Sequence, residues 1–138
     1  MRIGILTFHY ACNYGAMLQT YATQEFLRSM GHDVCVVDYR NKSVEEGYAA
    51  WNFKIDLLKT LPRAFSRAMR NSRFRHFMKE CLVLSKDPFD SFDVLLFGSD
   101  QIWNEMITGG FDKIYWGDFT TKARKVAWAA SANVLSFS

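Results

Sequence analysis

Apolar and polar residues alternate along the chain in blocks that fit an α/β fold. Residues 3–7 form a short apolar run bounded by polar residues, which is typical of a buried parallel strand. Residues 16–30 then carry apolar side chains at helical spacing, and Gly31 follows as a C-terminal helix stop. A second apolar run at residues 34–38 completes a strand–helix–strand unit. This order predicts the opening of a doubly wound α/β fold.

The rest of the pattern predicts a loop, two helices and two more strands. We expect the loop at residues 40–50, helices at 53–61 and from Pro62 to about residue 80, and strands at 92–97 and 125–130. Together these elements predict one open, Rossmann-like parallel sheet with flanking helices over residues 1–138. Four strands leave an unpaired sheet edge, so we expect the natural protein to continue beyond this sheet.

Composition narrows the class of protein. The 138 residues fit one domain, and 49% of them are hydrophobic, which is ample for a buried core. A net charge of +3 does not point to nucleic acid. The three cysteines, Cys12, Cys35 and Cys81, form no C-x-x-C pair and are odd in number. With no signal-peptide pattern and no apolar run near the roughly 20 residues of a membrane span, we expect a cytoplasmic protein.

Polar residues follow three of the predicted strands. Ligands of open parallel sheets bind outside the carboxyl ends of the strands, and residues 9–15, 98–104 and 131–133 lie at such ends. Their side chains can exchange hydrogen bonds and stack on a ring, which suits a sugar or a sugar phosphate. The three segments are therefore the candidate ligand site.

The first two segments each have a simpler interpretation beside the functional one. Asn13 is a good helix N-cap and Gly15 allows close approach of a ligand, but a capped helix needs no ligand. Neither segment is G-x-G-x-x-G, and without that motif Asp38 does not indicate a dinucleotide site. In the second segment, Asp100 either contacts a ligand or caps a short helix.

The order and content of these segments resemble the polysaccharide pyruvyl transferase family. The resemblance rests on GILTFHYACNYGAMLQTYATQEFLRSMGHDVCVVDYR, DVLLFGSDQIWN and ARKVAWAASAN, and the G-S-D-Q-I-W-N run is its most specific part. Cys12 departs from it, because a small or polar residue, often Asn, is expected there. The resemblance implies a two-domain, glycosyltransferase-B-like architecture, in which this chain is the N-terminal, acceptor-side domain and the C-terminal domain is absent from it.

The resemblance also implies a reaction. Phosphoenolpyruvate is the donor substrate, no cofactor is needed, and a pyruvyl group passes to two hydroxyls of a sugar as a ketal. We expect the donor site largely on the absent domain and the isolated chain to be inactive. Two alternatives stay open, a nucleotide-sugar glycosyltransferase of similar architecture and a non-catalytic glycan-binding fragment.

This reaction needs a base for a sugar hydroxyl and an acid for the enol carbon, and Asp100 and His9 are the candidates. Trp103 either stacks on a sugar or lies in the core. A nucleophilic Cys12 beside His9 is disfavoured because no third group orients the histidine, and no residue cluster has metal-site spacing. The substrate-binding candidates are Asn13, Tyr14, Gly15, Gln19, Gly98, Ser99, Gln101, Trp103, Asn104 and Ser131.

A basic stretch follows Pro62. Arg63, Arg67 and Arg70 are spaced to share one face of the predicted helix. They form either a solvated helix face or a contact with anionic lipid or a lipid-diphosphate acceptor. The expected partners are thus a sugar or lipid-linked glycan acceptor and the inner face of the membrane, where a cytoplasmic enzyme would bind peripherally.

Overall fold

The computed structural model describes residues 1–47 and 62–132, without the side chains of residues 62–68 and Ser99. Its described residues form one open sheet of five parallel strands in the order β3-β2-β1-β4-β5. The strands are β1 (Arg2–Leu6), β2 (Asp33–Val37), β3 (Leu84–Ser85), β4 (Val94–Asp100) and β5 (Arg124–Ala130). This arrangement confirms the predicted Rossmann-like α/β fold.

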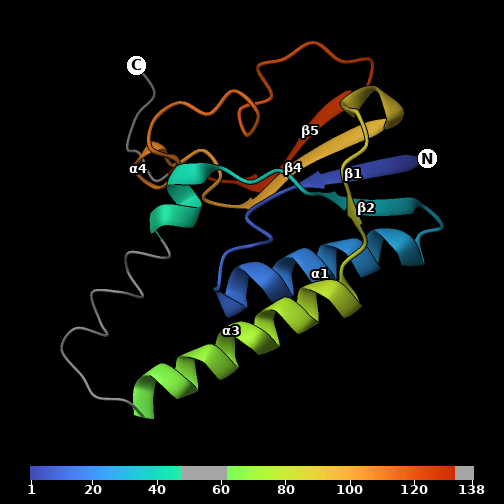
Figure 1. Ribbon diagram of the computed structural model, residues 1–138. Helices are drawn as coiled ribbons and strands as arrows, with labels where there is room; N and C mark the ends of the chain where they lie inside the picture. The colour runs from blue at the N-terminus through green and yellow to red at the C-terminus, as the bar shows by residue number, and fades with distance from the viewer. Residues whose placement is uncertain (48–61, 133–138) are drawn as a thin grey trace.

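Helices cover one face of this sheet and extend beyond its carboxyl edge. Helices α1 (Tyr14–Ser29) and α3 (Pro62–Cys81) lie side by side on one face (Figure 1), where the Tyr21 and Phe77 rings are 5.6 Å apart. Residues 42–47, which are helical, and α4 (Glu105–Thr108) lie beyond the carboxyl ends of the strands. A short 3-10 helix, η1 (Phe89–Ser91), precedes β4.

Strand side chains alternate between two hydrophobic cores because successive residues of a strand point to opposite faces. Ile3 and Ile5 of β1 pack with Leu96 in the core beneath α1 and α3. Leu6 and Phe97 pack on the opposite face with Tyr115, from the segment that joins α4 to β5. Both faces of the central strands are therefore buried, which explains their nearly continuous apolar sequences.

The ends of α1 follow local rules. The Asn13 side chain accepts a hydrogen bond from the Gly15 backbone N–H at 2.9 Å, which makes it the N-cap. At the other end, Gly31 has φ +85° and donates its N–H to the Arg28 carbonyl at 2.9 Å. Both predicted boundary residues are confirmed.

Several predicted boundaries were wrong. Residues 42–47 are helical rather than part of a loop, because the Asn41 side chain caps the Val44 N–H at 3.1 Å and Val44 is buried. β3 and α4 were missed because two and four residues are too short to show periodicity. β4 continues past Gly98 to Asp100. The helix predicted at residues 53–61 lies outside the described residues.

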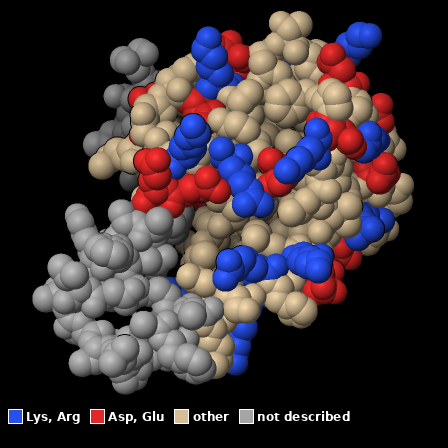
Figure 2. All heavy atoms as spheres, in the orientation of Figure 1, with Lys and Arg blue, Asp and Glu red and all other residues tan. Residues whose placement is uncertain are grey.

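Charges of both signs are mixed on one face of the molecule (Figure 2). On the face shown in Figure 2, Lys and Arg side chains are interspersed with those of Asp and Glu. No helix in the described part of the chain combines the length and the apolar character that crossing a membrane requires.

Candidate functional site at the carboxyl edge of the sheet

The carboxyl ends of β4 and β5 bring two of the predicted polar segments together. The Ser131 N–H donates to the Asp100 carbonyl at 3.0 Å, and the Trp103 N–H donates to the Ser131 carbonyl at 3.2 Å. These backbone hydrogen bonds continue the pairing of β4 with β5 past the end of the sheet. Residues 100–104 and Ser131 therefore lie next to one another at the carboxyl ends of β4 and β5, where open parallel sheets bind ligands.

Gly98 and Asp100 have unusual backbones at this point. Gly98 has φ +117°, and a Cβ atom there would overlap the Trp128 carbonyl, so only glycine allows β5 to approach so closely. Asp100 has φ +137°, a conformation almost confined to glycine. Its Oδ1 atom accepts the Gln101 N–H at 2.7 Å, which fixes the orientation of the carboxylate. Asp100 is half-buried, so part of it is open to solvent.

Asn104, rather than Asp100, is the N-cap of α4. Its Oδ1 atom accepts the Met106 N–H at 3.1 Å, and its Nδ2 donates to Gln101 Oε1 at 2.8 Å. Asn104 is buried, so this predicted substrate-binding residue has a structural role as the cap of α4. The alternative in which Asp100 caps the short helix is therefore wrong, and its carboxylate is not needed for capping.

The first polar segment, residues 9–15, does not contact a single region of the molecule. Tyr14 is exposed, and its ring packs against Phe74 on α3, with the ring centroids 4.5 Å apart. Gln19 lies one turn further along α1 and is exposed. Asn13 and Gly15 form the cap described above. The structure thus brings together Asp100, Gln101, Trp103, Asn104 and Ser131 but not Tyr14.

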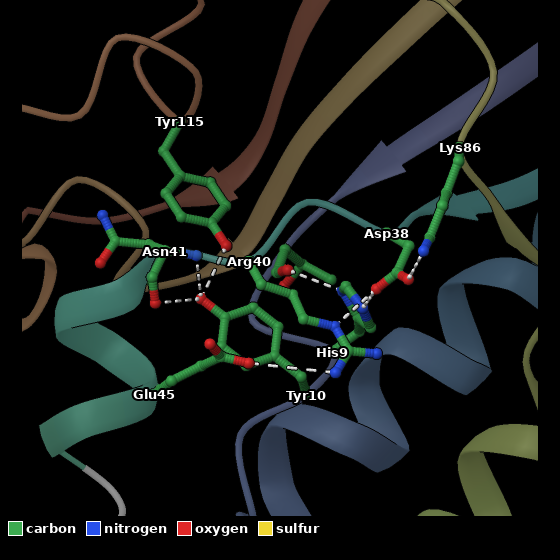
Figure 3. Close-up of polar contacts among 9 residues, drawn as sticks. His9, Tyr10, Asp38, Arg40, Asn41, Glu45, Lys86 and Tyr115 are labelled. Carbon is green, nitrogen blue, oxygen red and sulfur yellow. Dashed lines mark hydrogen bonds and ion pairs between the residues drawn. The ribbon is translucent and has the colours of Figure 1, made fainter.

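His9, the other candidate acid–base residue, is fully buried after β1. Its Nε2 lies 3.1 Å from Asp38 Oδ1 and its Nδ1 lies 3.3 Å from the Thr7 carbonyl oxygen, so both ring nitrogens face acceptors (Figure 3). Burial lowers the pKa of His9, and the hydrogen bond with Asp38 only partly opposes this effect. Such an enclosed ring links the ends of β1 and β2 and offers no face to a substrate.

Asp38 is a residue whose role the sequence did not reveal. Arg40 donates its Nε–H to Asp38 Oδ1 at 2.7 Å, and Lys86 Nζ lies 3.8 Å from Oδ2. Burial opposes ionisation of this carboxyl, but the hydrogen bonds from Arg40 and His9 lower its pKa. The ends of β2 and β3 thus carry two exposed cations around one carboxylate. The signal that could have indicated this was the position of Asp38 at the end of a strand.

Comparison with known protein families identifies the chain. The family model for polysaccharide pyruvyl transferase matches residues 13–137. The chain belongs to the polysaccharide pyruvyl transferase family. Neither the curated proteins nor the solved structures yielded a match. Membership supports a transferase that acts in polysaccharide modification. The matched range includes the Asp100 and Ser131 segments and leaves out His9.

A network of tyrosines, which the sequence analysis also did not identify, supports the carboxyl ends of the strands. Asn41 donates its backbone N–H to Tyr10 Oη at 2.8 Å, and the Tyr10 and Tyr115 hydroxyl oxygens are 3.3 Å apart (Figure 3). The Asp112 carboxylate accepts hydrogen bonds from Tyr39 at 2.9 Å and from Asn41 at 2.6 Å. Burial raises the pKa of Tyr10, Tyr39 and Tyr115, so these hydroxyls keep their protons.

Possible metal ligands are scattered in the described part of the chain. Within residues 1–47 and 62–132, no group of three His, Cys, Asp or Glu side chains is arranged to hold a metal ion. All three cysteines are free thiols, and Cys12 is half-buried after β1. The candidate site therefore consists of Asp100 and its hydrogen-bonded neighbours, with Trp103 beside them.

Proposed function

We propose that this chain is the acceptor-side domain of an enzyme that transfers a pyruvyl group from phosphoenolpyruvate to two hydroxyls of a sugar. The observation that carries the proposal is the joining of residues 100–104 to Ser131 where β4 and β5 end. Family membership gives the class of reaction, and this edge is where a doubly wound sheet binds ligands. Asn13, Gln101 and Ser131 supply polar groups for the acceptor sugar, and Gly15 allows its close approach.

The reaction balances without a cofactor. One sugar hydroxyl loses its proton and adds to C2 of phosphoenolpyruvate, while C3 gains a proton and becomes a methyl group. The second hydroxyl then adds to C2 and displaces phosphate, and its proton leaves with the phosphate, which gives a ketal and inorganic phosphate. In this scheme the Asp100 carboxylate accepts the hydroxyl proton. His9 holds the end of β1 in place from its buried position and does not itself exchange protons with substrate.

The donor carries a phosphate and a carboxylate, and both need cationic partners. At the described edge, Arg40 and Lys86 are already engaged with Asp38. We therefore place the phosphoenolpyruvate site on a C-terminal domain of a two-domain, glycosyltransferase-B-like enzyme. We place the enzyme in the cytoplasm, with a sugar or lipid-linked glycan as acceptor, because its cysteines are free thiols.

The test is phosphate release from phosphoenolpyruvate in the presence of a panel of glycan acceptors. We expect no turnover by the 138-residue chain alone and turnover by the product of the whole reading frame. Turnover by the chain alone would refute the assignment of the donor site to another domain. If nucleotide sugars, and not phosphoenolpyruvate, support transfer in the same assay, the protein is a glycosyltransferase and the proposal fails.

A further inference from the structure

Three aromatic rings form a stacked array beside the candidate site. The Trp103 and Trp116 ring centroids are 5.3 Å apart with an interplanar angle of 18°. The Trp116 and Phe111 centroids are 5.6 Å apart at 30°. Trp103 belongs to the segment that follows β4, whereas Phe111 and Trp116 belong to the connection between α4 and β5. The array, defined by these three residues, thus begins within the site and leads away from it.

Hydrogen bonds fix the inner part of the array. The Trp103 indole Nε1–H donates to the Tyr115 carbonyl at 2.9 Å, while the Trp103 backbone N–H is bound to Ser131. The Trp116 backbone N–H donates to the Asp112 backbone carbonyl at 3.0 Å. The Asp112 side chain is buried and accepts two further bonds, from the Ile114 and Tyr115 N–H groups. The rings are therefore pre-organised, which lowers the entropy cost of binding a ligand.

The outer end of the array is open to solvent. The Phe111 side chain is 54% exposed, whereas Trp103 and Trp116 are half-buried. Because the Phe111 side chain buries little apolar surface, it contributes little to the stability of the fold. A flat apolar ring at the surface, stacked on Trp116, which is itself stacked on Trp103, provides the type of face that packs against the C–H face of a pyranose. Membership in a family that modifies polysaccharides favours a sugar over other flat ligands.

We propose that the Phe111–Trp116–Trp103 array is a glycan-binding subsite that holds a pyranose unit of a polymeric acceptor against Phe111. Two ring spacings separate Phe111 from Trp103, so the unit at Phe111 is not the unit that reacts at the Asp100 segment. The array thereby selects extended glycans over single sugars. The assignment to the acceptor rests on the proposed function, but glycan binding itself does not require phosphoenolpyruvate.

The experiment measures binding of the 138-residue chain to dextran, galactomannan and xylan by affinity electrophoresis, with each polysaccharide cast into the gel. We expect retardation by at least one polymer. The Phe111→Ala variant should bind at least about tenfold more weakly, a loss of about 1.4 kcal/mol. Phe111→Trp should keep the binding because it keeps a flat ring. Phe111→Leu, which keeps apolar bulk without a flat ring, should lose it.

Phe26→Ala is the matched control, because Phe26 is 58% exposed on α1, away from the array. It should bind as the wild type does. Absence of binding to all three polymers, equal binding by Phe111→Ala, or equal loss in Phe26→Ala would each overturn the subsite. Binding of single-stranded DNA instead of glycans would also overturn it. Phe111-dependent glycan binding without any pyruvyl transfer would keep the subsite and refute the proposed function.

Discussion

At the scale of single residues, Asp100 combines an unfavourable backbone with an oriented carboxylate. A non-glycine residue at φ +137° costs on the order of 1–3 kcal/mol, and such residues gather at functional sites. Asn104 already caps α4, so helix capping does not require the Asp100 carboxylate. Helix capping therefore does not account for this strain, and we propose that the strain reflects a role in the reaction.

Two substitutions at Asp100 separate a functional role from a structural one. Asp100→Asn keeps the size of the side chain and the acceptor for the Gln101 N–H, but it cannot take a proton. We expect pyruvyl transfer by the product of the whole reading frame to fall at least about tenfold, or about 1.4 kcal/mol of barrier. The melting temperature should hardly change.

Asp100→Gly is the second substitution, because glycine adopts this φ without strain. It should leave the free energy of unfolding unchanged or higher and should still abolish most of the activity. Retained activity in both variants, or loss of activity only together with loss of fold, would make Asp100 a structural residue and remove it from the site.

Residue roles could be predicted where the rule is local. Asn13 and Gly31 were correct because a helix cap depends on neighbours within a few positions. The sequence analysis considered Asp100, and not Asn104, as the helix cap. The cap of α4 depends on where β4 ends, and that end is set by pairing with β5. Trp103 was a candidate for stacking on a sugar, but Trp116 and Phe111 could not be assigned to it from sequence.

At the scale of elements, His9 and Asp38 link the ends of β1 and β2. Because burial lowers the pKa of His9, the folded chain resists the proton that the unfolded chain takes up near pH 6.5. The free energy of unfolding should therefore decrease as the pH falls below about 6.5, until the lowered pKa of folded His9 is reached. The slope is at most about 1.4 kcal/mol per pH unit.

Urea denaturation between pH 5 and pH 8 measures this effect above the range in which carboxylates titrate. His9→Gln keeps polar contacts but has no group that titrates there, so its stability should vary less with pH. His76→Gln, at an exposed position on α3, serves as the control and should keep the wild-type dependence. An unchanged slope in His9→Gln would show that another group causes the pH dependence.

The sheet was predictable at this scale because apolar runs and helical spacing repeat over many residues. The polar links between elements were not predictable, because Tyr10 lies 105 residues before Tyr115 and Tyr39 lies 73 residues before Asp112. No local pattern reports such partners. β3 was missed for a different reason, since two residues show no alternation.

At the scale of the whole molecule, charge bears on the membrane partner. Figure 2 shows both signs interspersed on one face, so a general electrostatic attraction to lipid is weak there. Helix α3 begins at Pro62, which confirms the helical spacing of Arg63, Arg67 and Arg70. The side chains of Arg63 and Arg67 lie outside the described residues, and Arg70 is exposed. Membrane contact through this helix face stays a proposal.

A salt-dependent vesicle assay tests that proposal with the 138-residue chain. If the three arginines meet anionic headgroups, the chain should sediment with vesicles of mixed anionic and zwitterionic phospholipid at low ionic strength. Salt at 0.1 M, which screens charges beyond about 10 Å, should release it. Replacing all three with Gln should weaken binding by about 3 kcal/mol, on the order of a hundredfold, at about 1 kcal/mol per cation.

The matched control replaces Lys113, Lys122 and Arg124 with Gln. These three exposed cations lie outside α3, so the control removes the same net charge from another part of the surface. A site on α3 predicts strong loss in the first variant and little loss in the control. Equal loss in both would assign the attraction to net charge alone. If the wild-type chain ignores the vesicles at low ionic strength, the arginines form a solvated helix face, and the acceptor must reach the carboxyl edge without help from α3.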